Sequence, residues 1–107
     1  MLAHGKILFI CDDKSYVNEL KGQLSGLGDY TIAAESTAQA GVISLKESAC
    51  DLIIIRYAIP DLDILSAIAD LRKVDPDCVI VVLIEAEAGR DNSQFADVGV
   101  FDVLAWP

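Results

Sequence analysis

A short apolar run between two charges limits the possible folds of this sequence more than any other segment. It reads Asp51-Leu-Ile-Ile-Ile-Arg56 and is followed by a proline at position 60. Four mostly β-branched residues are too few for a buried helix and are typical of a strand that is buried on both faces. Ligands of open parallel sheets bind at the carboxyl ends of such strands. We therefore expect Arg56 to lie at the centre of any site in this domain.

The same pattern recurs along the chain. Other apolar runs predict strands over residues 6–11, 30–34, 79–84 and 101–106. Apolar residues three or four positions apart separate these runs, and they predict helices over residues 14–27, 36–47, 64–74 and 90–98. Ser36 or Thr37 can cap the second helix. A regular alternation of strand and helix predicts an α/β fold, with a parallel sheet and right-handed crossovers.

Composition excludes several classes of function. The chain has 107 residues, which is one domain, and 53% of them are apolar. The formal net charge is −9 and no basic cluster interrupts it. This argues against direct binding to nucleic acid or to an anionic membrane surface, because both need concentrated positive charge. No apolar run approaches the roughly 20 residues of a membrane helix, and Met1–Gly5 lacks the core of a signal peptide. We expect a cytoplasmic location.

The cysteines do not suggest a structural framework. There are three, Cys11, Cys50 and Cys78, and none lies in a CxxC pair. An odd number without such spacing argues against a disulfide scaffold or a zinc site. We expect all three to be reduced and to fill small apolar spaces.

Three segments carry a resemblance to a known family. Ile7-Leu-Phe-Ile-Cys-Asp12-Asp13 ends a strand in two acids, Asp51–Asp63 combines a strand with a proline loop, and Gly99–Pro107 runs from a glycine to a proline. Together they resemble the receiver domain of two-component response regulators. The resemblance implies a flavodoxin-like, doubly wound, parallel five-stranded sheet of order 2-1-3-4-5 over residues 1–107. The family's fifth helix has no counterpart in this sequence, so we expect residues 1–107 to be the N-terminal part of a longer chain.

The sequence departs from the family at the positions that carry its chemistry. Arg56 stands where the resemblance implies the phosphoacceptor aspartate, and Asp12 and Asp13 remain as the acid pocket. The other altered positions are Glu85 for the family's hydroxyl (Ile84 if the match slips by one residue), Val103 for its switch aromatic and Trp106 for its lysine.

A guanidinium at position 56 cannot accept a phosphoryl group, because it stays protonated and has no lone pair for attack. Asp51, Asp61 and Asp63 are the nearby acids that could substitute, and none follows the strand directly. We consider two interpretations of Arg56. It forms an internal ion-pair cluster with Asp12, Asp13 and Glu85, or it is a surface residue at a decayed site.

The leading hypothesis is therefore a pseudo-receiver, a receiver-like domain that is not an enzyme and cannot be phosphorylated. It would act in signal transduction through protein–protein contacts, controlling an output domain or dimerisation. The alternative is a phosphoacceptor receiver of a two-component phosphorelay. A third class is a small-molecule module, which gains little support because the loops lack a glycine-rich phosphate cradle.

The expected partners and cofactors follow from these hypotheses. We expect no metal site, since a fixed cation would lie beside any Mg²⁺, and Asp12 and Asp13 would be its ligands if one remained. We expect a protein partner or an attached output domain. Without a fifth helix, apolar sheet residues would meet water, which favours a homodimer or a longer chain. Trp106 is either a core aromatic or part of a partner surface.

Overall fold

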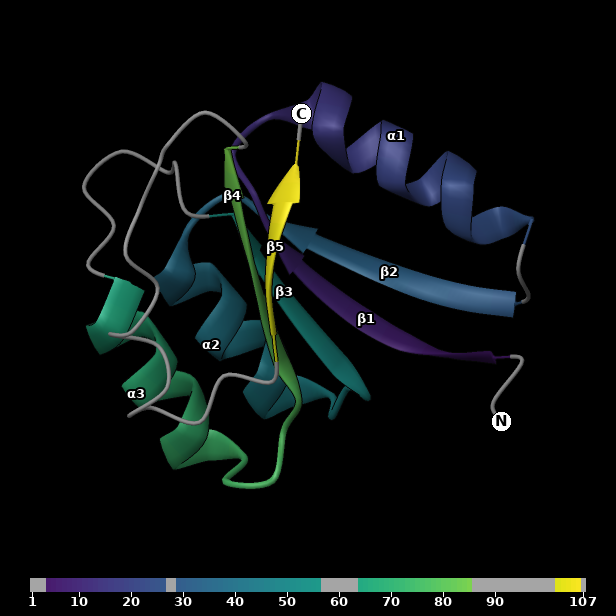
Figure 1. Cartoon of the computed structure of the whole chain (residues 1–107). Coiled ribbons are helices and arrows are strands. Elements are labelled where there is room, and N and C mark those ends of the chain that lie inside the picture. The colour runs from purple at the N-terminus through teal and green to yellow at the C-terminus, as the bar shows by residue number, and fades with distance from the viewer. Residues whose placement is uncertain (1–3, 27–28, 57–63, 86–101, 107) are drawn as a thin grey trace.

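Short apolar runs and amphipathic segments assemble into a parallel sheet with helices on both faces (Figure 1). The computed structural model describes residues 4–26, 29–56, 64–85 and 102–106. The elements are β1 His4–Ile10, α1 Lys14–Ser25, β2 Asp29–Glu35, α2 Ala38–Glu47, β3 Leu52–Arg56, α3 Ile64–Val74, β4 Ile80–Glu85 and β5 Asp102–Trp106. The helix expected over residues 90–98 lies outside the described residues.

The order of the strands brings distant parts of the sequence to one edge. The sheet has the order β2-β1-β3-β4-β5, and each neighbouring pair is parallel. Ile10 lies beside Ile55, which in turn lies beside Val82. The carboxyl ends of β1, β3 and β4 therefore meet at the same edge. The predicted flavodoxin-like α/β fold and the order of the first four strands are confirmed, and β5 pairs with β4 through its backbone.

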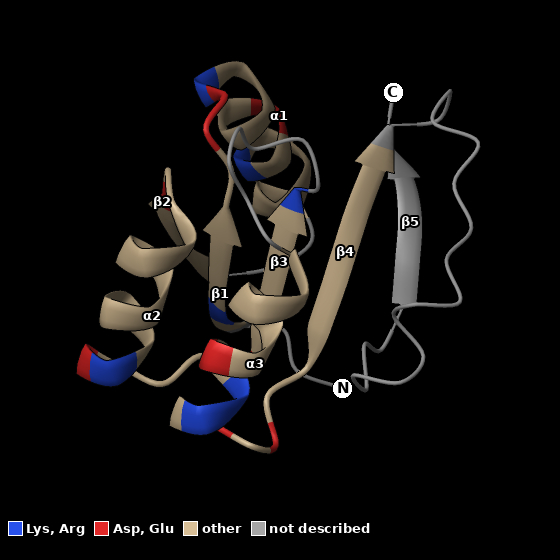
Figure 2. Ribbon diagram, turned by 90° about the vertical axis from the view of Figure 1, so that its left-hand side faces the viewer, with Lys and Arg blue, Asp and Glu red and all other residues tan. Residues whose placement is uncertain are grey.

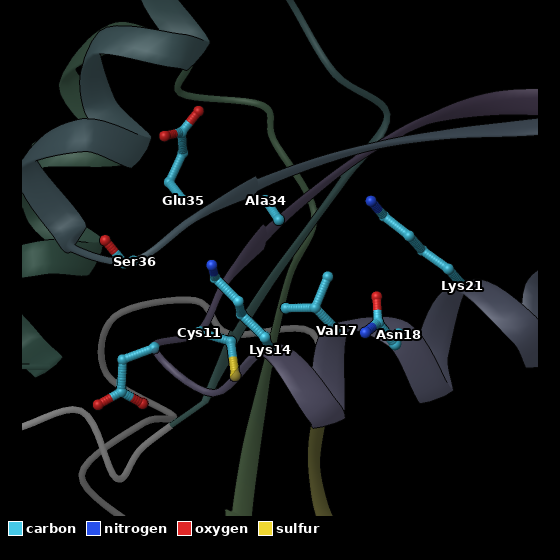
Figure 3. Close-up of a pocket in the computed structure, with 9 residues that line it drawn as sticks. Cys11, Lys14, Val17, Asn18, Lys21, Ala34, Glu35 and Ser36 are labelled. Atoms are coloured by element: carbon cyan, nitrogen blue, oxygen red, sulfur yellow. The ribbon is translucent and has the colours of Figure 1, made fainter.

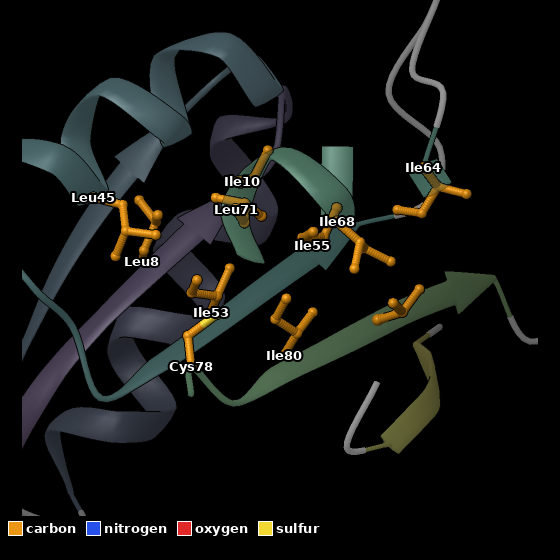
Figure 4. Close-up of a cluster of buried hydrophobic side chains, with 11 residues drawn as sticks. Leu8, Ile10, Leu45, Ile53, Ile55, Ile64, Ile68, Leu71, Cys78 and Ile80 are labelled. Atoms are coloured by element: carbon orange, nitrogen blue, oxygen red, sulfur yellow. The ribbon is translucent and has the colours of Figure 1, made fainter. Parts of the chain in front are cut away.

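Two apolar clusters hold the helices to the sheet. One lies under α2 and α3, and Figure 4 shows its strand and helix side chains meeting between the layers. We call it the α2–α3 cluster, and its buried members are Leu8, Ile10, Leu45, Ile53, Ile55, Ile64, Ile68, Leu71, Cys78, Ile80 and Val82. The other, the α1 cluster, lies under α1 on the opposite face. Its buried members are Ile7, Phe9, Cys11, Val17, Leu20, Ile54, Val81 and Leu83.

The α1 face of the sheet does not show the exposure that we expected from a missing fifth helix. Its described β3 and β4 residues are almost fully covered, with exposed fractions of 8% for Ile54, 9% for Val81 and 4% for Leu83. Among the described residues, the large apolar side chains that do reach solvent are Ile43 and Val79, on the α2 side and at the start of β4. The described part of the chain thus offers no broad apolar patch as an argument for a homodimer.

The boundaries of the helices follow from local chemistry. Thr37, of the two candidate caps, begins α2: its hydroxyl oxygen accepts a hydrogen bond from the Ala40 amide at 3.1 Å. Helix α1 ends at Ser25, earlier than the predicted residue 27, with Gly26 as its C-cap. Helix α3 spans the predicted residues 64–74, and Pro76 follows it. No helix in the described ranges has the length and hydropathy of a membrane span.

Two glycines in helices differ in what surrounds them, and this gives a first prediction. A Cβ atom at Gly41 of α2 would lie 2.6 Å from Cδ1 of Ile10, a fully buried residue, whereas one at Gly22 of α1 would meet nothing within 4 Å. Gly41→Val should therefore lower the free energy of unfolding by about 1–3 kcal/mol through overpacking. Gly22→Ala should raise it by up to about 1 kcal/mol through helix propensity. Urea denaturation of both variants checks this, and equal stabilisation by both would contradict the close approach of α2 to β1.

Candidate functional site

Arg56 is held at the carboxyl edge of the sheet by two neighbouring elements. Its Nη1 atom lies 3.5 Å from Oδ1 of Asp12, the second residue after β1. Its guanidinium carbon lies 4.1 Å from the centre of the Tyr16 ring on α1. Figure 2 shows the blue carboxyl end of β3 close to the red segment that leads from β1 into α1. The side chain of Arg56 is only 14% exposed, so it is not a free surface arginine.

The sheet register explains why these groups meet. Because β1 and β3 are parallel neighbours with Ile10 beside Ile55, the residues that follow each strand emerge at the same edge. The Arg56–Asp12 pair is partly exposed, so it contributes about 1 kcal/mol or less. The cation–π contact adds about 0.5–1 kcal/mol. Together they link β3 to the junction of β1 and α1.

Tyr16 is a site residue that the sequence analysis missed. It lies four residues before Leu20 and eight before Leu24, at helical spacing, and it packs at the border of the α1 cluster. This spacing was available from the sequence and placed Tyr16 on the sheet-facing side of α1. Its contact with Arg56, 40 residues further along the chain, follows only from the fold.

Asp13 has a different role from Asp12. It is the N-cap of α1, and its Oδ1 atom accepts hydrogen bonds from the Ser15 amide at 2.9 Å and the Ser15 hydroxyl at 2.6 Å. These bonds lower the pKa of Asp13 below its ordinary value of 3.8, and the nearby charge of Arg56 lowers it slightly further. The two acids that we expected to form one pocket are therefore divided between an ion pair and a helix cap.

The cap gives a prediction for the dependence of stability on pH. The pKa of Asp13 is lower in the folded chain than in the unfolded chain, so its contribution is present above about pH 4 and is lost as pH falls through the folded pKa. Asp13→Asn keeps a capping oxygen but does not titrate. We expect its free energy of unfolding to fall less between pH 5 and pH 3 than that of the unaltered chain. Urea denaturation at both pH values measures the difference, and parallel declines would contradict the assignment.

The other positions that the sequence analysis compared with the receiver family are located by their backbone only. Arg56 lies beside Leu83 of β4, so Glu85 ends β4 two residues beyond that level. Glu85 pairs with Trp106, and Val103 pairs with Val82. All three positions are thus on adjacent strands β4 and β5. The side chains of Glu85, Val103 and Trp106 lie outside what the structure describes, so the expected contact between Arg56 and Glu85 stays a prediction.

The described residues do not fit a magnesium ion well. Mg²⁺ prefers oxygen ligands that are free to complete an octahedron. Here the carboxylate of Asp12 faces the Arg56 cation and that of Asp13 is occupied by Ser15. Within the described ranges, no three His, Cys, Asp or Glu side chains gather into a group that could hold a metal.

A surface hollow borders the site between α1 and the end of β2. It measures about 420 Å³, and Figure 3 shows the side chains of Lys14 and Lys21 reaching into it from α1. Asp12 and Glu35 also line it, so the formal charges of its four charged residues cancel, and the buried Cys11 is a further lining residue. Burial raises the pKa of the Cys11 thiol. With a net formal charge of zero, the hollow does not concentrate positive charge.

The other acids near β3 in the sequence do not join this site in the described residues. The Oδ2 atom of Asp51 accepts a hydrogen bond from the Lys6 amide at 2.8 Å, and the Asp51 amide donates to the Lys6 carbonyl, also at 2.8 Å. Asp51 therefore joins the start of β3 to β1 at the amino ends of the strands, whereas Arg56 lies at the carboxyl end of β3. Asp61 and Asp63 lie outside the described residues.

Comparisons with known proteins identify the fold. No protein-family model and no curated protein matches the sequence. Among solved structures, a response regulator receiver domain protein from Clostridium thermocellum superposes with a TM-score of 0.81 at 24% identity, covering 95% of this chain and 82% of that one. The receiver domain of a Pseudomonas aeruginosa sensor histidine kinase, with magnesium in its active site cleft, gives 0.81 at 24% identity, covering 97% and 86%.

A third structure belongs to a longer protein. NtrX from Brucella abortus superposes with a TM-score of 0.84 at 17% identity, covering 97% of this chain and 23% of that chain. At such identities the likeness establishes a receiver-type fold. The chemistry of this chain depends on its own residues at the carboxyl edge.

Proposed function

We propose that this chain is a receiver-like signalling domain that does not accept a phosphoryl group and acts through contacts with other proteins. The observation that carries the proposal is the position of Arg56, which ends β3 at the carboxyl edge and is held by Asp12 and Tyr16. In the receiver-type fold this edge is where a phosphoacceptor carboxylate would lie.

The chemistry at this edge opposes phosphorylation. An aspartyl phosphate forms when a carboxylate oxygen attacks phosphorus, and a guanidinium offers no such oxygen. Asp51 is about 16 Å away, at the other end of a five-residue strand. Asp12 and Asp13 are carboxylates, but one is paired with a cation and the other caps α1.

Arg56 instead supplies a permanent positive charge at this edge. A receiver that is switched by phosphate gains and loses charge there, whereas a guanidinium keeps its charge at any physiological pH. The contacts of Arg56 with Asp12 and Tyr16 tie β3 to the start of α1. We infer that the domain stays in one conformational state and that partner binding or abundance, in place of phosphorylation, sets its output.

The partners that we propose are proteins. NtrX shows that a fold of this kind occurs within a much longer chain, which supports an attached output domain beyond residue 107. Self-association into a homodimer is the second possibility, and sedimentation of the chain at several concentrations would distinguish a monomer from it. We also propose a cytoplasmic location, and the net charge of −9 opposes direct binding to nucleic acid.

The experiment that tests the proposal is intact mass spectrometry after incubation with Mg²⁺ and acetyl phosphate. We expect no phosphoryl adduct on this chain, while a receiver with an aspartate at this position, incubated alongside, gains one. An adduct on this chain would refute the proposal and restore the phosphoacceptor alternative, which the fold and the Asp12–Asp13 pair otherwise support. Mapping of the labelled peptide would then identify the acceptor.

A further inference from the structure

Two cysteines lie at the amino ends of neighbouring strands, far from Arg56. Cys50 precedes β3 and Cys78 precedes β4. Ile53 lies beside Ile80, and the Ile53 amide donates to the Val79 carbonyl at 2.8 Å. Extending this register by two residues brings Cys78 level with the residue that follows Cys50. With strands about 4.8 Å apart and a rise of about 3.3 Å per residue, the two Cα atoms are about 6 Å apart, within the range of disulfides.

The side chains of both cysteines pack against the α2–α3 cluster. Cys78 is 5% exposed and belongs to the α2–α3 cluster, and Cys50 packs against that cluster while keeping partial contact with solvent. Figure 4 shows the sulfur of Cys78 directed toward Ile53 of β3. Burial raises the pKa of the Cys50 thiol, and the charge of a Cys78 thiolate would raise it further. Both thiols are free in this structure.

Arg72 of α3 lies against the thiol of Cys78. Its Nη1 atom is 3.7 Å from Sγ of Cys78, and the same nitrogen donates to the carbonyl oxygens of Cys78 and Pro76. Arg72 is partly buried, at the border of the α2–α3 cluster to which Cys78 belongs. A guanidinium beside a sulfur stabilises the thiolate, which is the form that attacks another sulfur atom.

We propose that Cys50 and Cys78 form a reversible intramolecular disulfide when the chain meets a peroxide. The more exposed Cys50 thiolate attacks one oxygen of hydrogen peroxide, which forms a sulfenic acid and releases hydroxide. The Cys78 thiolate then attacks the Cys50 sulfur, forming the S–S bond and releasing a second hydroxide. With the two thiol protons, the products are the disulfide and two molecules of water, so the peroxide is reduced and both cysteines are oxidised.

The disulfide would stabilise the fold only under oxidising conditions. Burial raises the pKa of both thiols, so the reduced pair is slow to react and resists mild oxidants. Once formed, the bond closes the segment between residues 50 and 78, which contains β3 and α3. A cross-link of this length should raise the midpoint of thermal unfolding by on the order of 10 °C. It thereby fixes the strand that carries Arg56, independently of whether the domain is phosphorylated.

The test treats the whole chain with hydrogen peroxide, blocks free thiols by alkylation and measures the intact mass and the disulfide peptides. We expect a Cys50–Cys78 peptide in the unaltered chain and in Cys11→Ser. This variant is the matched control because Cys11 is about as buried as Cys78 but lies at the carboxyl ends of the strands. Reduction with dithiothreitol should reverse it. Cys50→Ser and Cys78→Ser should form none.

Two results would overturn the proposal. One is an unaltered chain in which peroxide leaves both thiols free, or converts them to sulfinic acids without an S–S bond. The other is a disulfide that includes Cys11. Because the disulfide is mapped in the unaltered chain, the result does not depend on the folding of the serine variants. A further variant, Arg72→Gln, should slow disulfide formation several-fold while leaving the final product the same.

Discussion

Replacing Arg56 by aspartate is expected to create a Mg²⁺ site at the carboxyl edge of the sheet. The change removes a cation that lies 3.5 Å from Asp12 and adds a carboxylate at the end of β3. A unit charge at about 4 Å contributes roughly 4 kcal/mol at the effective dielectric constant of a protein surface, although solvent reduces this. We expect Mg²⁺ to bind on the order of 100-fold more tightly to the variant than to the unaltered chain, as measured by isothermal titration calorimetry.

A matched variant separates the two contributions. Arg56→Met removes the cation and keeps a long apolar stem over Tyr16, but it adds no ligand. We expect at most a small gain in Mg²⁺ affinity from it. In Arg56→Asp, Mg²⁺ should also raise the midpoint of thermal unfolding, because it relieves the repulsion between carboxylates that it bridges. Equal affinities for Arg56→Asp and Arg56→Met would show that Asp12 is not placed to share a metal with position 56.

Replacing Ile68 by alanine is expected to cause the largest loss of stability. Ile68 lies on α3, is fully buried, and belongs to the cluster that holds α2 and α3 on the sheet. Truncation of a buried isoleucine leaves a cavity and costs about 2–5 kcal/mol. Because single domains are stable by only about 5–15 kcal/mol, this is a large share of the total. Urea denaturation should show a lower midpoint with an almost unchanged slope.

The control is Ile43→Ala on α2. This isoleucine is 57% exposed, so the same chemical change removes little buried surface. We expect its free energy of unfolding to change by no more than about 0.5 kcal/mol. A loss at position 43 as large as that at position 68 would mean that α2 presents a different face to the sheet from the one described here.

Much of the fold could be predicted because its signals are local. The buried β3 run between Asp51 and Arg56 is a strand with its charged ends at opposite sheet edges. Helix α3 begins at Ile64 and ends at Val74, as its apolar spacing and Pro76 predicted. The ends of β1 and α1 were less accurate, because fraying and capping depend on single hydrogen bonds that periodicity does not reveal.

The sequence predicted which residues lie at the site better than it predicted which of them contact one another. The alternation of strands and helices put Asp12 and Arg56 at one edge, and the structure pairs them. Asp13, which we assigned to the same pocket, instead caps α1 through Ser15. An aspartate directly before a helix is a common cap, so this competing role was available from the sequence.

Tyr16, in contrast, lies at the site only because of tertiary packing. Its ring covers the Arg56 guanidinium only because the α1 cluster packs this helix against β1 and β3. The proximity of Cys50 and Cys78 likewise follows from the register of β3 against β4.

By itself the sequence determined the α/β class, the order of the described elements and the presence of a guanidinium at the end of β3. These depend on hydrophobic periodicity and on residue identity, which are properties of short segments. Only the tertiary structure decided which acid pairs with Arg56, which aromatic ring covers it and which two cysteines lie together. Those contacts join residues 28 to 44 positions apart, and their geometry is set by strand register and helix packing, which no short segment contains.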